Sequence, residues 1–422
     1  MSRDTLINEI GEWLIDQTLT EPDIVVMFEQ VCFRLRSVGV PISRARVTWP
    51  TLHPLFQAET ILWRLDGDIE FEQFRHQDDA SEEWKRSPMA MMLKNNITEF
   101  RRNLTGPNKL LDFPILDDLA EQGFTDYLII ATSFEGNTGA ELHAQSRGLI
   151  VTWSSDRESG FSDDDLAALK KIQRRFAAAC KMAIRMRIAK SVTETYLGRY
   201  AGSRVLDGAI KLGDGETVQA VVWYSDMRDS TKLADTMPAA DLLALLNEYF
   251  ECTAGAATRF GGEVLDFIGD AVLAIFPFEN EEGRKQAIRM STMALEESQA
   301  MIEDVNARRR ANGDMPILFG VGINVGEVLY GNIGVADRLA FTVIGPVVNE
   351  VERIESLTKS LQAAALVSEE VAAQDPEKWT SIGMQSLSGF ARDCELFALK
   401  SQVESKSGSV TAQKAQLKVV TP

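Results

Sequence analysis

Cysteine, histidine and long apolar runs are scarce in this sequence, and each shortage argues against a class of protein. The 422 residues contain four cysteines and three histidines. The cysteines lack metal-binding spacing, which argues against a zinc motif and predicts reduced thiols (Cys32, Cys180, Cys252 and Cys394). No uncharged apolar stretch approaches the length that spans a bilayer, and the first residues lack the apolar core of a secretory signal. We therefore expect a soluble, cytoplasmic protein with no membrane partner.

Positive charge is also in short supply. Lysine and arginine number 44 against 62 aspartates and glutamates, so the formal net charge is −18. A field of that sign repels polyanions, which argues against a nucleic-acid partner or an anionic membrane surface. A phosphate-bearing substrate must then be received locally, by bound cations or a few arginines. The apolar share of 45% is ordinary for soluble proteins and suffices for packed cores.

The first part of the chain, residues 1–162, opens with a helix-like pattern and then mixes strands and turns. Asp66 and Gly67 form a hairpin signal between two apolar runs. The runs 127–134 and 147–153 are typical of central strands. This α/β plan loosely resembles a GAF- or PAS-type sensory domain, without a specific motif for either. The ligand or partner of such a domain stays unknown: a hydrophobic small molecule, a partner protein and a redox change are all open.

Residues 163–215 are expected to form a helical signalling linker. Ser162 is placed to cap the helix, and the aspartates 163–165 suit its positive N-terminal end. An apolar stripe at three- and four-residue steps follows: Leu169, Ile172, Phe176, Ala183, Ile184 and Ile188. The stripe either packs on the first domain or pairs with a second copy in a parallel dimer. The polar tail 401–422 lacks a sustained pattern, and we expect it to be disordered.

The sequence pattern of residues 216–400 predicts a second domain in which strands and helices follow each other along the chain. Strand 218–225 precedes helix 238–260, a hairpin at 263–276 and a long helix at 283–310. Two more strands, a helix from Val347 and a last strand at 394–400 complete the pattern. A β-α-β-β-α-β order predicts a ferredoxin-like sheet with helices on one side. The expected fold class is therefore α+β, a ferredoxin-like domain preceded by an α/β domain and a helical linker.

Two aspartates are candidates for metal binding. Asp226 follows an apolar strand, and Asp270 lies in a Gly-Asp turn between two strands. The hairpin strands of a ferredoxin-like sheet lie beside its first strand, so the two turns can converge. Paired carboxylates suit Mg²⁺, which prefers oxygen ligands and keeps positions open for phosphates. Taken singly, Asp226 also suits a helix cap and Asp270 an ordinary turn.

Asn349 and Arg353 are the second candidate pair. They are four residues apart, so they share one face of a helix. An arginine can hold phosphate oxygens and neutralise developing charge, and an asparagine can orient a ribose. The alternative is a surface helix in which Arg353 pairs with Glu350 or Glu352.

Together these motifs resemble the catalytic domain of class III nucleotidyl cyclases. In that family two domains pair head to tail, and each site takes metal-binding aspartates from one chain and an asparagine and arginine from the other. The resemblance implies two Mg²⁺ or Mn²⁺ ions at Asp226 and Asp270, with the Met227 carbonyl as a lesser ligand. It implies that Asn349 orients the ribose and that Arg353 stabilises the transition state.

The resemblance also implies further contacts, and the sequence departs from the family at some of them. Four residues before the second metal aspartate, adenylyl cyclases have lysine and guanylyl cyclases glutamate; here it is Asp266. Thr342 takes the other base-selecting position, where many bacterial adenylyl cyclases also have threonine. Ionised Asp266 only accepts hydrogen bonds, which suits guanine, unless it faces away from the base or is paired with a cation. Ser388 replaces a lysine that often binds triphosphate, and Arg338 is either a phosphate contact or solvated.

We therefore expect a homodimeric adenylate cyclase that converts ATP to cyclic AMP and pyrophosphate under control of its first domain. Two alternatives stay open. One is a guanylate cyclase acting on GTP, which Asp266 favours. The other is a degenerate cyclase domain that serves as a nucleotide-binding or interaction module, which Asp266 and Ser388 favour.

Overall fold

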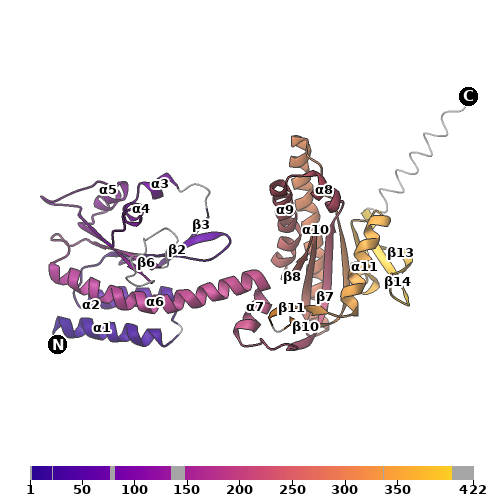
Figure 1. The fold of residues 1–422 in the computed structure, drawn as a ribbon, viewed down its shortest axis with the longest axis horizontal. Coiled ribbons are helices and arrows are strands. Elements are labelled where there is room, and N and C mark those ends of the chain that lie inside the picture. The colour runs from indigo at the N-terminus through magenta and orange to yellow at the C-terminus, as the bar shows by residue number, and fades with distance from the viewer. Residues whose placement is uncertain (1, 21, 77–80, 135–147, 336, 402–422) are drawn as a thin grey trace, which may run out of the picture. The chain divides into compact units, whose positions relative to one another are not determined.

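The computed structural model divides into two compact units, Met1–Thr195 (unit 1) and Tyr196–Pro422 (unit 2) (Figure 1). It describes residues 2–20, 22–76, 81–134, 148–335 and 337–401. The tail 402–422, and with it the expectation of disorder there, lies outside the described residues. Across the described ranges, no helix combines the length and apolar character needed to cross a membrane.

Unit 1 consists of one six-stranded sheet and helices on both of its faces. Its strands are β1 (Arg44–Pro50), β2 (Phe56–Arg64), β3 (Glu70–Arg75), β4 (Glu99–Asn103), β5 (Asp126–Ser133) and β6 (Gly148–Ser155). Its helices are α1 (Arg3–Thr18), α2 (Ile24–Ser37), α3 (Glu82–Lys85), α4 (Pro88–Lys94), α5 (Pro114–Glu121) and α6 (Asp163–Leu197).

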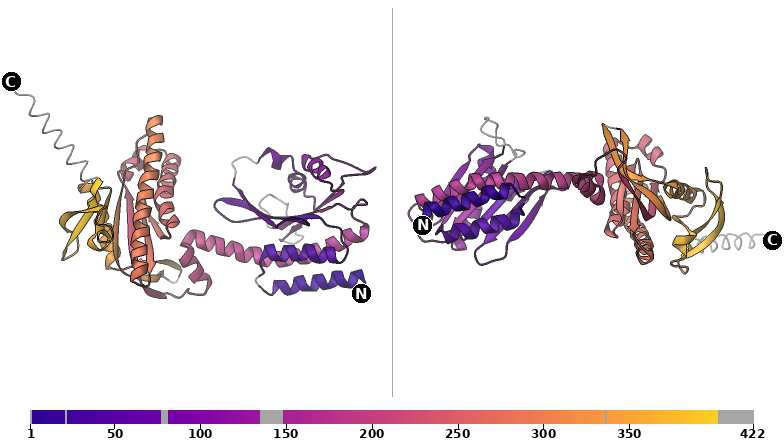
Figure 2. Two further views of the ribbon diagram at one scale, coloured as in Figure 1. Left: turned by 180° about the vertical axis from the view of Figure 1, so that it is seen from behind. Right: turned by 90° about the horizontal axis from the view of Figure 1, so that it is seen from below.

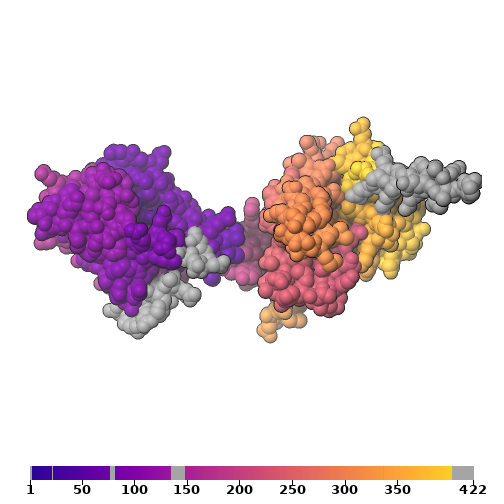
Figure 3. Space-filling view, turned by 90° about the horizontal axis from the view of Figure 1, so that it is seen from above, coloured from indigo at the N-terminus to yellow at the C-terminus, as the bar shows by residue number. Residues whose placement is uncertain are grey.

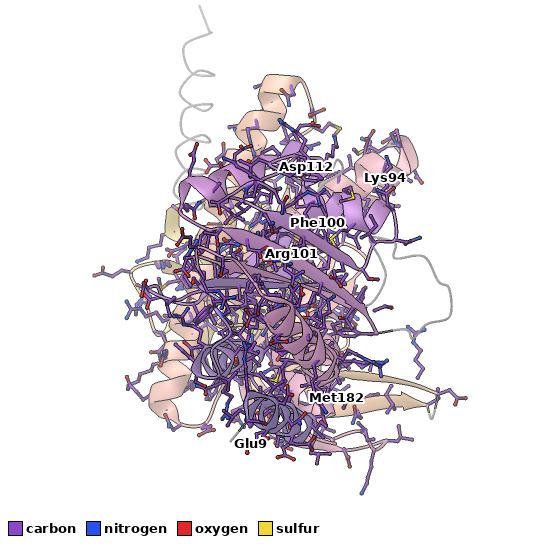
Figure 4. All side chains as sticks on the ribbon, turned by 90° about the vertical axis from the view of Figure 1, so that its left-hand side faces the viewer. Glu9, Lys94, Phe100, Arg101, Asp112 and Met182 are labelled. Atoms are coloured by element: carbon purple, nitrogen blue, oxygen red, sulfur yellow. The ribbon has the colours of Figure 1, made fainter. Side chains whose placement is uncertain are left out.

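The strands follow the order β3-β2-β1-β6-β5-β4, and every neighbouring pair is antiparallel. Helices α1, α2 and α6 lie across one face, over a core that includes Phe28, Trp153 and Phe176 (Figure 2). Figure 4 shows this layer near Glu9 and Met182, with the sheet between it and the layer near Lys94 and Asp112. On that second face α4 and α5 pack on β4 and β5, and Figure 3 views the unit from their side.

The predicted features of unit 1 are present. The turn at Asp66 and Gly67 joins the antiparallel strands β2 and β3, with Leu62 opposite Glu70. The two runs predicted as central strands form β5 and β6, which are interior strands of the sheet. The α/β plan of this region is therefore confirmed.

Helix α6 begins as the sequence predicts and buries its apolar stripe in unit 1. The Ser162 hydroxyl accepts from the backbone N–H of Asp165 at 3.2 Å, and the Asp165 carboxylate accepts from the backbone N–H of Ser162 at 2.9 Å. This reciprocal pair satisfies two N–H groups that a helix start leaves free. The predicted stripe is buried from Leu169 to Ile184, and Ile188 packs on the same core. The stripe therefore packs on its own first domain.

Unit 2 is built on an eight-stranded sheet. Its strands are β7 (Gly215–Met227), β8 (Glu263–Ile268), β9 (Ala271–Phe278), β10 (Phe319–Val335), β11 (Arg338–Ile344), β12 (Ala365–Ser368), β13 (Trp379–Ser386) and β14 (Asp393–Leu399). Its helices are α7 (Arg199–Leu206), α8 (Ser230–Thr236), α9 (Ala239–Arg259), α10 (Glu281–Asn312), α11 (Pro346–Ser360) and α12 (Glu369–Ala372). The end of α10 lies at the surface of this unit (orange in Figure 3).

The strand order β10-β7-β9-β8 at one end of this sheet is the predicted ferredoxin-like core, which confirms the α+β fold class. The sheet continues through β12, β14 and β13, and β11 pairs with β10. The prediction that helices cover only one side was wrong. Helices α9 and α10 pack on one face, whereas α11 packs on the other. Strand β7 is accordingly apolar on both faces, with Ala220 and Val222 alternating with Val221 and Trp223.

Candidate active site

Asp226 and Asp270 meet at one end of the β7–β9 strand pair. Asp226 is the last residue but one of β7, inside the strand rather than after it as the sequence suggested, and it is partly buried. Strand β9 runs beside β7 with Val272 opposite Ser225, which brings the preceding turn residue Asp270 to Asp226. Gly269 opens that turn with a φ of 67°, a left-handed conformation that favours glycine.

The carboxylates of Asp226 and Asp270 are held close together, and the pKa of Asp226 reflects this. Burial, together with the nearby carboxylates of Asp270 and Glu355, raises the pKa of Asp226 to about 7, against the backbone N–H of Met227, which lowers it. The Oδ2 atom of Asp270 is buried and has no hydrogen-bond partner among the described residues. An orphaned acceptor beside a second carboxylate fits a divalent cation with oxygen ligands. The described contact of Met227 is through its N–H, so a role for its carbonyl stays a proposal.

Glu355 is a third carboxylate near this pair, and the sequence reasoning missed it. It lies on α11, is only 6% exposed, and accepts a hydrogen bond from the Thr358 hydroxyl at 3.1 Å. Burial raises its pKa, and Thr358 and Arg228 counter part of that effect. The signal was available in principle, because Glu355 lies four residues after Val351 on the buried side of an amphipathic helix.

Two glycines of β10 let α11 approach the sheet this closely. A Cβ atom at Gly320 would lie 2.2 Å from the Thr358 hydroxyl, and one at Gly322 would lie 2.6 Å from the Val351 carbonyl oxygen. Both distances are too short for a side chain, so these positions require glycine for packing.

Asn349 and Arg353 face away from the aspartates of their own chain. Both are exposed, whereas the side of α11 that packs on the sheet carries Val347, Val351 and Ile354. Among the residues with a described position, Arg353 contacts the exposed Glu352, with its Nη1 atom 3.5 Å from Oε1 of Glu352. The structure therefore does not bring the two candidate pairs together within one chain.

A pocket of about 420 Å³ opens beside Asp226 and contains lysines that the sequence reasoning missed. Its two lysines are Lys232 and Lys359, and the other lining residues are Asp226, Met227, Asp229, Ser230, Thr231 and Asp235. The Nζ atom of Lys359 lies 4.0 Å from Oδ1 of Asp229. On helix α11, Lys359 thus lines the pocket of its own chain, whereas Asn349 and Arg353 are exposed outside that pocket.

The remaining predicted contacts lie outside this pocket. Asp266 is exposed on β8, and Thr342 is partly buried on β11, opposite Gly331. Strand β11 runs near β8, so the two base-selecting candidates come from neighbouring strands of one chain. Arg338 and Ser388 are both exposed and do not line the pocket.

Residues 215–381 match the family described as "Adenylate and Guanylate cyclase catalytic domain". Unit 2 contains a class III cyclase catalytic domain. An uncharacterized protein of Mycobacterium tuberculosis is 32% identical over 240 residues, which are 55% of this chain and 40% of that protein. The adenylate cyclase of Anabaena cylindrica is 31% identical over 163 residues, which are 38% of this chain and 32% of that enzyme. The chain therefore spans two fifths or less of the length of these two relatives.

Two solved structures of cyclases are also similar. The adenylyl cyclase CyaB from P. aeruginosa is 27% identical with a TM-score of 0.39, over 44% of this chain and 95% of that one. The guanylyl cyclase Cya2 is 26% identical with a TM-score of 0.38, over 44% of this chain and 93% of that one.

Proposed function

We propose that the chain is an adenylate cyclase that makes cyclic AMP and pyrophosphate from ATP at sites shared between two copies. The observation that carries the proposal is the arrangement of the two residue pairs. Asp226 lines the pocket and has Asp270 beside it, whereas Asn349 and Arg353 are exposed on α11 and do not line the pocket. A site that needs both pairs is complete only when a second chain presents its α11 to this pocket.

Each pair has a defined task in the proposed reaction, the attack of the ribose 3′-hydroxyl on the α-phosphate. Asp226 and Asp270 would hold divalent cations, which activate the hydroxyl and neutralise the triphosphate. Lys232 and Lys359 line the same pocket and add positive charge for the phosphates, where Ser388 supplies none. Arg353 of the second copy would neutralise charge that develops on the phosphate, and its Asn349 would fix the ribose.

Exposed apolar side chains at both ends of the central strands of unit 2 support a dimer. Phe267 and Ile268, directly before the Asp270 turn, are 51% and 52% exposed. Leu329 and Ile344 are cross-strand partners on β10 and β11 and are 44% and 49% exposed. Neighbouring exposed apolar side chains form patches of the kind that commonly mark protein interfaces.

Guanylate cyclase activity is the second candidate, because of Asp266. Its exposed carboxylate only accepts hydrogen bonds, and guanine offers N1–H and an amino group. Thr342 can donate or accept and decides little. The adenylate cyclase of Anabaena cylindrica among the relatives supports ATP.

The test is product identification with the purified chain. The protein is incubated with Mn²⁺ and ATP or GTP, and cyclic products are measured by mass spectrometry. We expect cyclic AMP as the main product, its loss in Asp270→Ala, and its retention in Asp235→Ala, an exposed aspartate of the same pocket. Cyclic GMP as the main product would favour the second candidate. Activity that survives Asp270→Ala would contradict the metal-site proposal.

A further inference from the structure

A row of polar residues crosses the sheet of unit 1 near one end. Arg44 on β1 lies between Arg64 on β2 and Ser154 on β6. The row continues through Tyr127 on β5 to Arg102 on β4. The next residues along the three central strands, which point to the opposite face, belong to the core under α1, α2 and α6 (Ala45, Trp153 and Leu128). The row therefore lies on the second face of the sheet.

The other arginines on this face are paired with carboxylates. Arg64 pairs with Glu70, and Arg102 holds Asp112 through two hydrogen bonds of 3.0 and 2.8 Å. Arg46, two residues after Arg44, contacts Glu72 at 3.4 Å.

Arg44 is different from these arginines. Its guanidinium forms neither a hydrogen bond nor an ion pair with the residues that the structure describes, although the side chain is only 8% exposed. A guanidinium stays charged in proteins, so burying it without a partner is costly. Burial lowers the pKa of Arg44, and the like charges of Arg46 and Arg64 lower it further, against Tyr127 and Glu70. A second observation concerns hydroxyl groups around it. Thr152 and Ser154, which lie on the same face of the sheet as Arg44, carry buried hydroxyl oxygens without hydrogen-bond partners in the described part of the chain.

A bound anion with oxygen acceptors would pair with both the nearly buried Arg44 cation and these two unpaired hydroxyl groups. We propose that Arg44 receives a small organic anion on the second face of the unit 1 sheet, through the anion's carboxylate or phosphate group. The two-pronged guanidinium matches either group, and the Ser154 hydroxyl is its neighbour across the strand pair. Tyr127, whose pKa burial raises to about 12, keeps its proton and stays a hydrogen-bond donor.

The proposal makes an unusual stability prediction. If only a bound anion pairs with the Arg44 guanidinium, the protein without anion contains a buried unpaired charge. Replacing Arg44 by an uncharged side chain removes this charge. Arg44→Met should then melt at or above the temperature of the wild type in buffer without carboxylate or phosphate. Arg102→Met is the matched control from the same row, because it breaks an existing pair with Asp112, and it should melt lower.

The binding experiment uses the full chain with succinate, glycerol 3-phosphate and inorganic phosphate as probes. Thermal melting and calorimetry should detect saturable stabilisation of the wild type by at least one probe, and the preferred probe tells carboxylate from phosphate. Arg102→Met should keep this response. Arg44→Met should bind about thirtyfold more weakly or worse, as expected when one partner of a buried charge pair is removed.

Three results would overturn the proposal. One is the absence of a saturable response to any of the probes in the wild type. Another is an equal response in Arg44→Met. The third is an Arg44→Met protein that melts below the wild type without anion or fails to fold, because that would make Arg44 a structural residue. Ser154→Ala gives an independent check: it should fold normally and weaken binding of the preferred probe, and unchanged binding would remove Ser154 from the site.

Discussion

Replacing Asp226 by asparagine should stabilise the chain when no divalent cation is present. The pKa of Asp226 is raised from its ordinary value of 3.8 to about 7, by burial and by the charges of Asp270 and Glu355. The folded protein therefore holds a proton that the unfolded chain releases near pH 4. Between about pH 4 and pH 7 the free energy of unfolding falls as pH rises, and above pH 7 the loss is complete.

The size of the effect follows from the difference between the pKa of Asp226 in the folded protein and its ordinary value. Each pKa unit is worth about 1.4 kcal/mol, so the full difference would correspond to about 4 kcal/mol. Solvent screens a partly exposed carboxylate, and we therefore expect about 2 kcal/mol for Asp226→Asn at pH 8. The variant removes the charge and nearly keeps the shape of the side chain.

Scanning calorimetry of the full chain in EDTA measures the effect between pH 5 and pH 8. The Asp226→Asn protein should melt above the wild type at pH 8, and the gain should shrink as pH falls toward 5. Adding Mn²⁺ should raise the melting temperature of the wild type more than that of the variant. Asp235→Asn, at an exposed position of the same pocket, should change little. A variant less stable than the wild type in EDTA at pH 8 would refute the reasoning.

Three further predictions concern packing, capping and base choice. Gly320→Ala should lower the free energy of unfolding by about 1–3 kcal/mol in chemical denaturation, because the new methyl group meets Thr358, whereas Gly283→Ala on α10 should be nearly neutral. Ser162→Ala should cost about 1 kcal/mol in the same assay, because α6 loses its cap, and an unchanged value would contradict the capping assignment. Asp266→Lys should raise the ratio of cyclic AMP to cyclic GMP about tenfold in an ATP and GTP competition, because lysine can donate to adenine N1; an unchanged ratio would mean that residue 266 does not contact the base.

The core of unit 2 could be predicted because its long strands and helices carry clear periodicity. The neighbouring positions of Asp226 and Asp270 follow from that order alone, since a ferredoxin-like sheet places the hairpin beside the first strand. Strands β12 and β13 were not predicted. The first has four residues, too few to show alternation, and the second contains Gly383 with a φ of 83° and an irregular register.

The partners of buried charges could not be predicted from the sequence. Helical spacing indicates that Glu355 is buried, but not that it lies near Asp226 and Asp270, because this depends on the depth to which α11 packs. Nor does the spacing show that the exposed Lys359, four residues further along the same helix, lines the pocket beside Asp226. In unit 1, only the register across neighbouring strands, which the sequence does not show, reveals that the guanidinium of Arg44 lacks a carboxylate.

The central claim is that one complete site needs two chains, and mixing two inactive variants tests it most directly. Asp226→Ala removes a metal-binding aspartate, and Arg353→Ala removes the outward-facing arginine. Each variant alone should be inactive, and the mixture should regain cyclase activity, because one of the two sites in a mixed dimer keeps both wild-type residues. At equal amounts, with random exchange, we expect about a quarter of wild-type activity, since half of the dimers are mixed and each has one intact site. No recovery, despite demonstrated subunit exchange, would contradict the shared site.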